Sequence, residues 1–210
     1  NGKKVTAVVE LLARFDEESN IKWSKRMQEE GVNVIFGVEG LKIHSKLLYI
    51  ESKKGNIACV GTGNFHEGNA KIYTDYLMMT ARTKLVNEVA KVFDFIDRPF
   101  SPFRFNELLV SPNSMKSRIL RMLDTEIKNA NEGMEAWVKM KINHITDTDM
   151  VTKLYQASKA GVKIDIVIRG SCSLVPGIAK LSDNIRCVGI IDRYLEHSRI
   201  LIFANGGKPR

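Results

Sequence analysis

The chain contains the stretch Leu41-Lys42-Ile43-His44-Ser45-Lys46-Leu47-Leu48-Tyr49-Ile50 and, much later, Tyr194-Leu195-Glu196-His197-Ser198-Arg199-Ile200-Leu201-Ile202-Phe203. Both copies place His, Ser and a cation before an apolar run that is typical of a buried strand. Two segments in front of them also match: residues 2–9 with 161–168, and 32–36 with 185–190. The repetition predicts two related halves in which the two histidines face one cleft.

Strands and helices are predicted to alternate in both halves, which makes the fold class α/β. Compact β-branched runs favour strands, and apolar residues at helical spacing favour helices. The predicted strands are residues 5–10, 32–37, 43–51, 57–61, 108–111, 137–142, 162–169, 185–191 and 199–203. The predicted helices are residues 17–30, 84–95, a segment capped by Asn113 or Ser114 that runs to about 131, and 148–160. We expect a mixed sheet flanked by helices in each half, with a pseudo-two-fold relation between them.

The break between the halves is predicted at Pro99, Ser101 and Pro102, which gives domains at residues 1–100 and 101–210. The first half lacks counterparts of the opening elements of the second half. The chain also starts at Asn1 without an initiator Met and stops in what reads as a turn at 206–210. These observations predict that the sequence is part of a longer protein.

The net charge of the chain indicates that its partners are anionic. The 210 residues carry 32 Lys plus Arg against 24 Asp plus Glu, a net charge of +8. This surplus favours nucleic acid, an anionic membrane surface or a phosphate-rich substrate, and does not choose among them. No apolar run approaches the length of a membrane span. The three cysteines, Cys59, Cys172 and Cys187, lack metal-type spacing and have apolar neighbours, so we expect buried free thiols in a reducing compartment.

The chemistry is predicted to centre on His44, Lys46 and His197. At a strand start, His44 and Lys46 would share one face, because strand residues alternate with period two. The histidine can attack phosphorus, and the lysine can neutralise phosphoryl oxygens. His197 can then act as acid or base, or bind the leaving phosphate. A single histidine beside an apolar strand is more often structural, but the repeated pattern favours catalysis.

Several other residues are candidates for phosphate binding. Gly61-Thr62-Gly63-Asn64 reads either as a plain turn or as a phosphate cradle, in which Asn64 donates its amide. Arg14, Arg169 and Arg193 lie near strand ends, where α/β proteins bind ligands, although a surface ion pair is the alternative for each.

Three further positions are less informative. Tyr73 could stack on a base or be an ordinary strand aromatic. His66 and His144 show no partner pattern, so they are interpreted as structural or surface residues.

The paired His-x-Lys and His-x-Arg resemble the phospholipase D superfamily, which usually has an acid seven residues after each histidine. Glu51 stands there in the first copy, but Ala204 stands there in the second, which argues against an ordinary phosphodiesterase. The whole chain more closely resembles bacterial polyphosphate kinases of the first type. The segments that carry this resemblance are Val9-Glu10-Leu11-Leu12-Ala13-Arg14-Phe15-Asp16-Glu17-Glu18, Gly40-Leu41-Lys42-Ile43-His44-Ser45-Lys46, Gly61-Thr62-Gly63-Asn64-Phe65, Tyr73-Thr74-Asp75-Tyr76 and Asp192-Arg193-Tyr194-Leu195-Glu196-His197.

The resemblance implies two phospholipase D-like halves and reversible transfer of the terminal phosphate of ATP to polyphosphate, with Mg²⁺. It implies that His44 becomes phosphorylated and that Tyr73, Arg169 and His197 hold the nucleotide. Arg14 would lie at the phosphate and Mg²⁺ site, where we expect it to contact phosphate oxygens rather than the metal.

The resemblance also bears on partners. They would be ATP, ADP and polyphosphate rather than nucleic acid. The full-length protein would be a homo-oligomer with additional N-terminal and middle domains. It would be cytoplasmic, either free or attached peripherally to the inner membrane. Two alternatives remain open: a phospholipase D-type phosphodiesterase or nuclease, and a non-catalytic module that binds anions or nucleic acid.

Overall fold

A computed structural model describes residues 2–11 and 17–210. By its internal contacts the chain divides into two compact units, residues 1–60 with 79–108, and residues 61–78 with 109–210. Residues 61–78 therefore group with the later part of the chain. Arg14 lies outside the described residues, so its predicted role is not examined by the structure.

The first unit contains two small sheets. Strands β1 (Thr6–Val9) and β2 (Asn33–Phe36) pair in parallel, and helix α1 (Glu17–Glu29) lies between them in the sequence. The helix ends one residue before the predicted end at Glu30, and Gly31 adopts a φ of +80° that suits the position after a helix C-terminus. The other sheet has the order β3-β4-β6, with β3 at Lys46–Ile50, β4 at Ile57–Gly61 and β6 at Leu77–Thr80.

Helix α3 (Thr83–Asp97) supplies the core of the first unit. Its Val86 and Val89 pack with Ala58 of β4, and Leu47, Tyr49 and Phe93 surround them. One charged side chain, Glu88, is buried on the same helix at 5% exposure. Its carboxylate accepts the backbone N–H groups of Asn106, Glu107 and Leu108, at 2.5, 3.0 and 2.7 Å.

This contact explains one wrong prediction. A strand was predicted at residues 108–111, but the structure forms none there. The N–H of Leu108 goes to Glu88 instead of a neighbouring strand, and the Leu108 side chain packs against the small core. A buried carboxylate therefore replaces a sheet ladder as the partner of this backbone.

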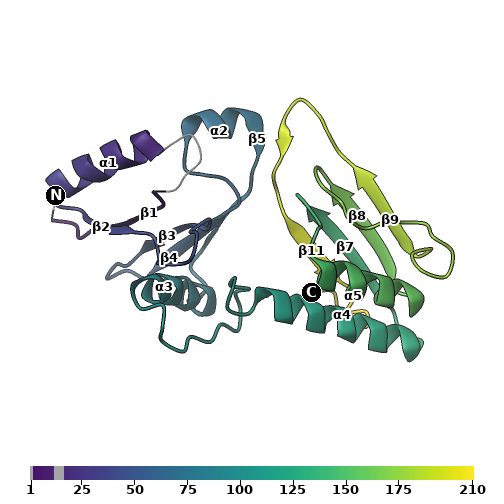
Figure 1. Ribbon diagram of the computed structural model, residues 1–210. Coiled ribbons are helices and arrows are strands. Elements are labelled where there is room, and N and C mark those ends of the chain that lie inside the picture. Colours follow the sequence, from purple (N-terminus) through teal and green to yellow (C-terminus); the bar gives the residue numbers. More distant parts are fainter. Residues whose placement is uncertain (1, 12–16) are drawn as a thin grey trace. The chain divides into compact units, whose positions relative to one another are not determined.

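The second unit is built on a four-stranded sheet of order β11-β7-β8-β9 (Figure 1). Strand β7 (Trp137–Ile142) is parallel to β8 (Lys163–Ile168), β8 is parallel to β9 (Ile185–Gly189), and β11 (Ile200–Phe203) runs antiparallel to β7. This mixed sheet confirms the predicted α/β class.

One face of this sheet packs on helices α4 (Met115–Asn131) and α5 (Thr148–Lys159). The alternation of β8 explains the choice of face, because Ile164, Ile166 and Ile168 are buried while Lys163 is exposed. Leu123 of α4 and Leu154 of α5 complete this core with no exposed surface. Among the described residues, no helix is long and apolar enough to cross a membrane.

Three short elements of the second unit were absent from the sequence prediction. They are helix α2 (Glu67–Ile72) and the two-residue strands β5 (Tyr73–Thr74) and β10 (Leu195–Glu196), which pair with each other in parallel. His66 caps α2, since its Nδ1 accepts the N–H groups of Gly68 and Asn69 at 3.1 and 3.4 Å. The structural interpretation of His66 agrees with this contact.

We predict that Glu88→Gln destabilises the first unit by about 2 kcal/mol, because an amide is a weaker partner for three N–H donors. Burial raises the pKa of Glu88, but the N–H groups of Leu108, Asn106 and Glu107 and the charge of Lys91 outweigh it and lower that pKa. The stabilisation is thus complete above the ordinary Glu pKa of 4.5 and is lost as pH falls through the lowered value.

Hydrogen exchange of the amides of residues 106–108 measures this effect directly. Faster exchange is expected in Glu88→Gln at neutral pH, with the difference from wild type shrinking in acid. The exposed neighbour Glu107 supplies the matched control, Glu107→Gln, which should exchange as wild type does. Equal rates in wild type and Glu88→Gln would contradict the assignment.

Candidate functional site

His197 lies at the centre of a polar cluster in the second unit. Its ring Nδ1 is 2.6 Å from Oδ1 of Asp75, and only 9% of the residue is exposed. A carboxylate accepts hydrogen bonds, so Asp75 favours the tautomer that carries the proton on Nδ1. In the neutral ring Nε2 is then an acceptor, and a guanidinium nitrogen of Arg199 lies 3.3 Å from it. Protonation would turn Nε2 into a donor for a bound anion.

The predicted phosphate cradle positions Asp75. The hydroxyl of Thr62 donates to Oδ1 of Asp75 at 2.7 Å and accepts the N–H of Tyr76 at 3.0 Å. Gly63 lies so close that a Cβ there would be 1.9 Å from Oδ2 of Asp75. The turn therefore has a structural task, holding the carboxylate. Asn64, the fourth residue of the cradle, is exposed.

The β5–β10 pair brings Tyr73 to His197. The Thr74 hydroxyl accepts the N–H of His197 at 3.2 Å and donates to Glu196 at 3.1 Å. The rings of Tyr73 and His197 meet edge to face, with centroids 5.1 Å apart. Two residues that are 124 positions apart by their numbers thus form one wall of the site.

Lys141 anchors the segment on both sides of His197. From β7, its ammonium group forms an ion pair with Glu196 and donates to the Ser198 hydroxyl. The hydrogen bond from Lys141, opposed by desolvation and helped by Thr74, lowers the pKa of Glu196. This role could not be predicted from the sequence, because a lysine in a strand is usually a solvent-facing residue.

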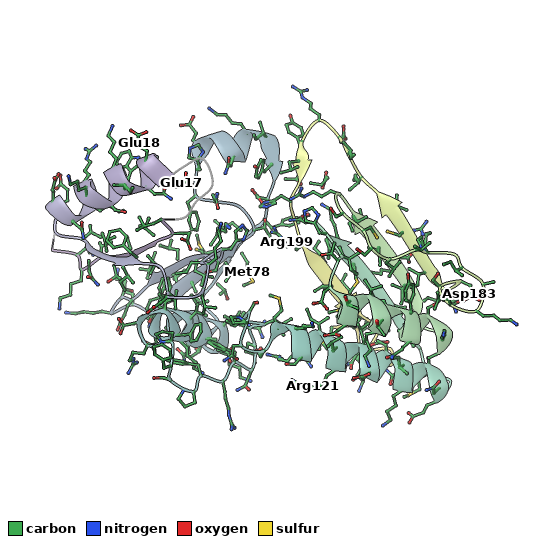
Figure 2. All side chains as sticks on the ribbon, in the orientation of Figure 1. Glu17, Glu18, Met78, Arg121, Asp183 and Arg199 are labelled. Atoms are coloured by element: carbon green, nitrogen blue, oxygen red, sulfur yellow. The ribbon has the colours of Figure 1, made fainter. Side chains whose placement is uncertain are left out.

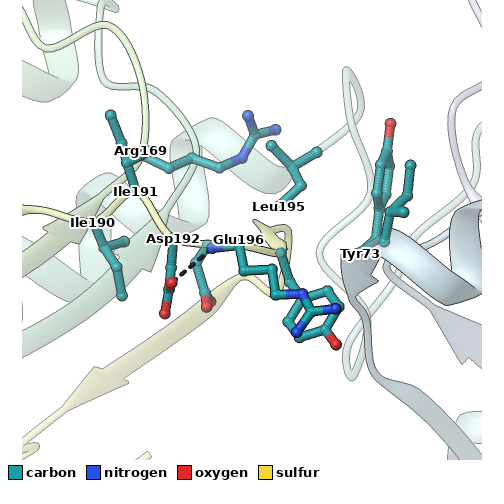
Figure 3. Close-up of a pocket in the computed structure, with 10 residues that line it drawn as sticks. Tyr73, Arg169, Ile190, Ile191, Asp192, Leu195 and Glu196 are labelled. Carbon is teal, nitrogen blue, oxygen red and sulfur yellow. Dashed lines mark hydrogen bonds between the residues drawn. The ribbon is translucent and has the colours of Figure 1, made fainter.

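A cavity of about 430 Å³ opens beside this cluster (Figure 3). Its lining includes Tyr73, Arg169 and Arg193, all predicted to bind the nucleotide, together with Ile72 and residues 190–196. Figure 3 shows the Arg169 side chain extending toward Leu195. The site thus combines an aromatic wall with cations, which suits a ligand with a base and phosphates.

Arg169 is held by the residues that follow β7. Its Nε donates to Oδ1 of Asn143 at 2.9 Å, and Nδ1 of His144 accepts the N–H of Ser171 at 2.9 Å. The interpretation of His144 as structural omitted this contact with the Arg169 loop. Gly170 fits beneath the ring of His144, where a Cβ would lie 2.4 Å from Cε1.

Two guanidinium groups lie near each other in this site. Partial desolvation and the charge of Arg169 lower the pKa of Arg199, while the charge of Asp75 raises it. Arg199 stays protonated at any physiological pH. Like charges held together repel, and a bound anion relieves the repulsion. The arrangement therefore favours phosphate.

His44 and Lys46 belong to the first unit. A strand was predicted from residue 43, but β3 begins at Lys46, because the N–H of Ile43 donates to the Glu10 carboxylate at 2.8 Å. His44 is exposed and precedes the strand, so the reasoning that both side chains share a strand face is wrong. The Lys46 ammonium donates to the His44 carbonyl oxygen. His197 likewise precedes its strand, β11.

Comparisons with known proteins identify the family. A family model described as polyphosphate kinase C-terminal domain 1 matches residues 1–102, and one described as C-terminal domain 2 matches residues 108–210. The chain belongs to the polyphosphate kinase family and corresponds to its C-terminal region. The predicted resemblance is confirmed.

Individual relatives agree. The chain is 53% identical to the polyphosphate kinase of Vibrio parahaemolyticus and 50% identical to that of Escherichia coli K12, over 100% of its own length. It spans 31% of each of those relatives. A crystal structure of polyphosphate kinase from Porphyromonas gingivalis matches 99% of this chain and 35% of its own, at 42% identity and a TM-score of 0.86.

We predict that Gly63→Ala destabilises the second unit by at least ~1 kcal/mol, because the new methyl group would overlap the Asp75 carboxylate. The measurement is the thermal unfolding midpoint, together with the NMR signals of the His197 ring. Gly189 offers a matched control in β9, since an added Cβ there meets nothing within 4 Å. Equal destabilisation by Gly63→Ala and Gly189→Ala would show that Gly63 is not constrained by Asp75.

Proposed function

We propose that this chain carries the catalytic site of an ATP:polyphosphate phosphotransferase in which His44 is phosphorylated. The proposal rests mainly on the position of His197. Its ring is hydrogen-bonded to Asp75 and lies beside a cavity lined by Tyr73 and Arg169. A buried, oriented imidazole flanked by cations suits transfer of a phosphoryl group, a reaction that depends mainly on positioning and charge neutralisation.

The nucleotide occupies the cavity of the second unit in this proposal. Tyr73 contacts the base or ribose, and the guanidinium groups of Arg169 and Arg193 bind phosphate oxygens. Arg193 is exposed and stacks over Tyr194, with its guanidinium carbon 5.5 Å from the ring centroid, so it can reach a ligand without leaving a buried partner. Asn64 donates its side-chain amide to phosphate.

The transfer takes place in two steps. A ring nitrogen of His44 attacks the terminal phosphorus of ATP, the bond to the bridging oxygen breaks, and ADP leaves. An oxygen of the terminal polyphosphate unit then attacks the phosphohistidine, and the P–N bond breaks. Lys46 neutralises the phosphoryl oxygens, and His197 binds or protonates the leaving phosphate.

Mg²⁺ supplies charge neutralisation of the phosphates in this scheme. Within the residues that the structure describes, no group of three His, Cys, Asp or Glu side chains could hold a metal ion. We therefore propose that Mg²⁺ is bound mainly by the phosphates themselves. In this proposal Arg14 binds the same phosphate oxygens.

The partners proposed for the whole protein are ATP, ADP and inorganic polyphosphate. Further domains are proposed because the chain spans about a third of its relatives. Assembly as a homo-oligomer and a cytoplasmic location, with or without peripheral attachment to the inner membrane, are proposed on the family resemblance alone.

His44→Ala in the full-length protein is predicted to abolish both acid-labile phosphate on the protein and polyphosphate synthesis, because the attacking nitrogen is lost. Incubation with ATP labelled in the terminal phosphate, followed by acid and alkali stability tests, measures the first. His66→Asn is the control, since asparagine can also cap a helix and His66 is exposed. Normal synthesis by His44→Ala would refute the covalent mechanism.

Asp75→Asn is predicted to lower kcat on the order of 100-fold, because an amide that donates to Nδ1 enforces the opposite tautomer of His197. The exposed Asp183, on the loop before β9 (Figure 2), supplies the control Asp183→Asn. If Asp75 positions the His197 ring, Asp75→Glu should recover part of kcat, and the pH profile of Asp75→Asn should differ from wild type. A variant that merely fails to fold would show neither effect. An unchanged kcat and pH profile in Asp75→Asn would contradict the role.

The phospholipase D-type alternative predicts hydrolysis of a simple phosphodiester without ATP. Such enzymes usually place an acid where Ala204 stands, and Ala204 is completely buried. The kinase reading is favoured for this reason. Turnover of bis(p-nitrophenyl) phosphate that depends on His44 and His197 would reverse that preference. DNA binding that survives loss of both histidines would favour the non-catalytic module.

A further inference from the structure

The cavity beside His197 is lined by charges that cancel. Among the residues that the structure describes, Arg169 and Arg193 are the cations of its lining, and Asp192 and Glu196 are the anions. A site for the phosphates of a nucleotide requires a surplus of positive charge. The lining alone does not supply that surplus, so the cations behind it decide how strongly the cavity attracts phosphate.

Glu196 has a structural task, although its charge opposes an anionic ligand. Its Oε2 accepts the hydroxyl of Thr74 at 3.1 Å, and the oxygen of that hydroxyl accepts the backbone N–H of His197 at 3.2 Å. Only 18% of the Glu196 side chain is exposed, so solvent and salt screen its charge poorly. The carboxylate therefore helps to hold the histidine and at the same time repels a phosphate in the cavity.

Lys141 reaches the same carboxylate from β7, although it does not line the cavity itself. Its ammonium group forms an ion pair with Oε2 of Glu196, and 25% of its side chain is exposed. The same ammonium group donates to the hydroxyl of Ser198, a residue that is almost completely buried. The hydrogen bond from Lys141 is the largest cause of the lowered pKa of Glu196. Both partners are therefore charged at neutral pH, and the lysine nitrogen is held in place.

We propose that Lys141 is a positioning residue for phosphate binding, which acts through Glu196. Its ammonium group neutralises the carboxylate, so Glu196 can hold the segment of His197 without repelling the phosphates of the nucleotide. This role rests on the proposed function, because the ligand of the cavity is taken to be a nucleotide. The structural grounds are the ion pair, the burial of both side chains, and the place of Glu196 in the cavity wall.

An ion pair with a purely structural task would behave differently. Removal of either partner would then leave a poorly solvated charge unpaired, and both changes would harm the site. In the proposed role the two changes have opposite effects on phosphate binding. Loss of the ammonium group leaves an uncompensated carboxylate in the cavity wall, whereas loss of the carboxylate charge leaves an additional cation behind it. The sign of each effect separates the two cases.

The KM for ATP of the full-length protein, measured during polyphosphate synthesis at low ionic strength, tests these signs. Lys141→Met should raise this KM several-fold while kcat changes less, because methionine fills the space of the lysine without its charge. Glu196→Gln should give an equal or lower KM than wild type, since the amide oxygen can still accept the Thr74 hydroxyl. The double variant should return the KM toward the wild-type value. High salt should narrow these differences.

Lys139 supplies the matched control. It lies on the same face of β7 as Lys141, is exposed, and has its ammonium group over the ring of Trp137, 5.1 Å from the centroid. Lys139→Met removes the same charge from the same strand and should keep the wild-type KM. All assays contain dithiothreitol, because Cys172 is exposed and Cys187 is half-buried, contrary to the prediction that all three thiols are buried.

An unchanged KM in Lys141→Met would overturn this role, as would an equal rise in Lys139→Met. So would a KM raised equally by Lys141→Met, Glu196→Gln and the double variant, because a structural ion pair behaves in that way. If Lys141→Met does not fold, Glu196→Gln decides alone: a KM at or below the wild-type value supports the role, and a raised KM overturns it. Absence of polyphosphate synthesis by the wild-type protein would refute the proposed function, and the role of Lys141 with it.

Discussion

The candidate site of the second unit depends on one half-buried carboxylate, Asp75, hydrogen-bonded to one imidazole, His197. Each residue is also held by contacts of its own. Asp75 accepts a hydrogen bond from Thr62 and packs against Gly63, and the backbone N–H of His197 donates to the Thr74 hydroxyl. The pair then fixes both the tautomer of the ring and the direction in which its free nitrogen points. The cavity, the ring of Tyr73 and the cations Arg169 and Arg199 are therefore arranged around a histidine whose ring orientation is held by hydrogen bonds.

The sequence predicted one strand in each unit well, because the signal for a strand is local in the sequence. The bounds of β4 and β7 match the predicted residues, since compact β-branched runs leave few other options. The short strands β5 and β10 were missed, because each has two residues and exists only through the other. Glu88 shows a related limit: periodicity places it on α3 but does not reveal that it binds the backbone of residues 106–108.

The candidate site was predicted in part for the same reason. Tyr73, Arg169 and His197 were found from motifs, and the structure brings them to one cluster and its adjoining cavity. Asp75 lies within one of the family motifs, but its role could not be predicted, because its partner is 122 residues away. Lys141 and Asn143 carry no motif, and their contacts depend on the register of β7. The relation of His44 to His197 stays a prediction.

The membership of residues 61–78 in the second unit has a consequence for the evolution of the chain. The two repeats resemble a duplicated ancestor, yet Thr62, Tyr73 and Asp75 are encoded in the first repeat and serve the histidine of the second. The second repeat therefore depends on the first. It could not be inherited or moved to another gene alone without depriving His197 of the residues that hold it, so selection would keep the two repeats in one reading frame.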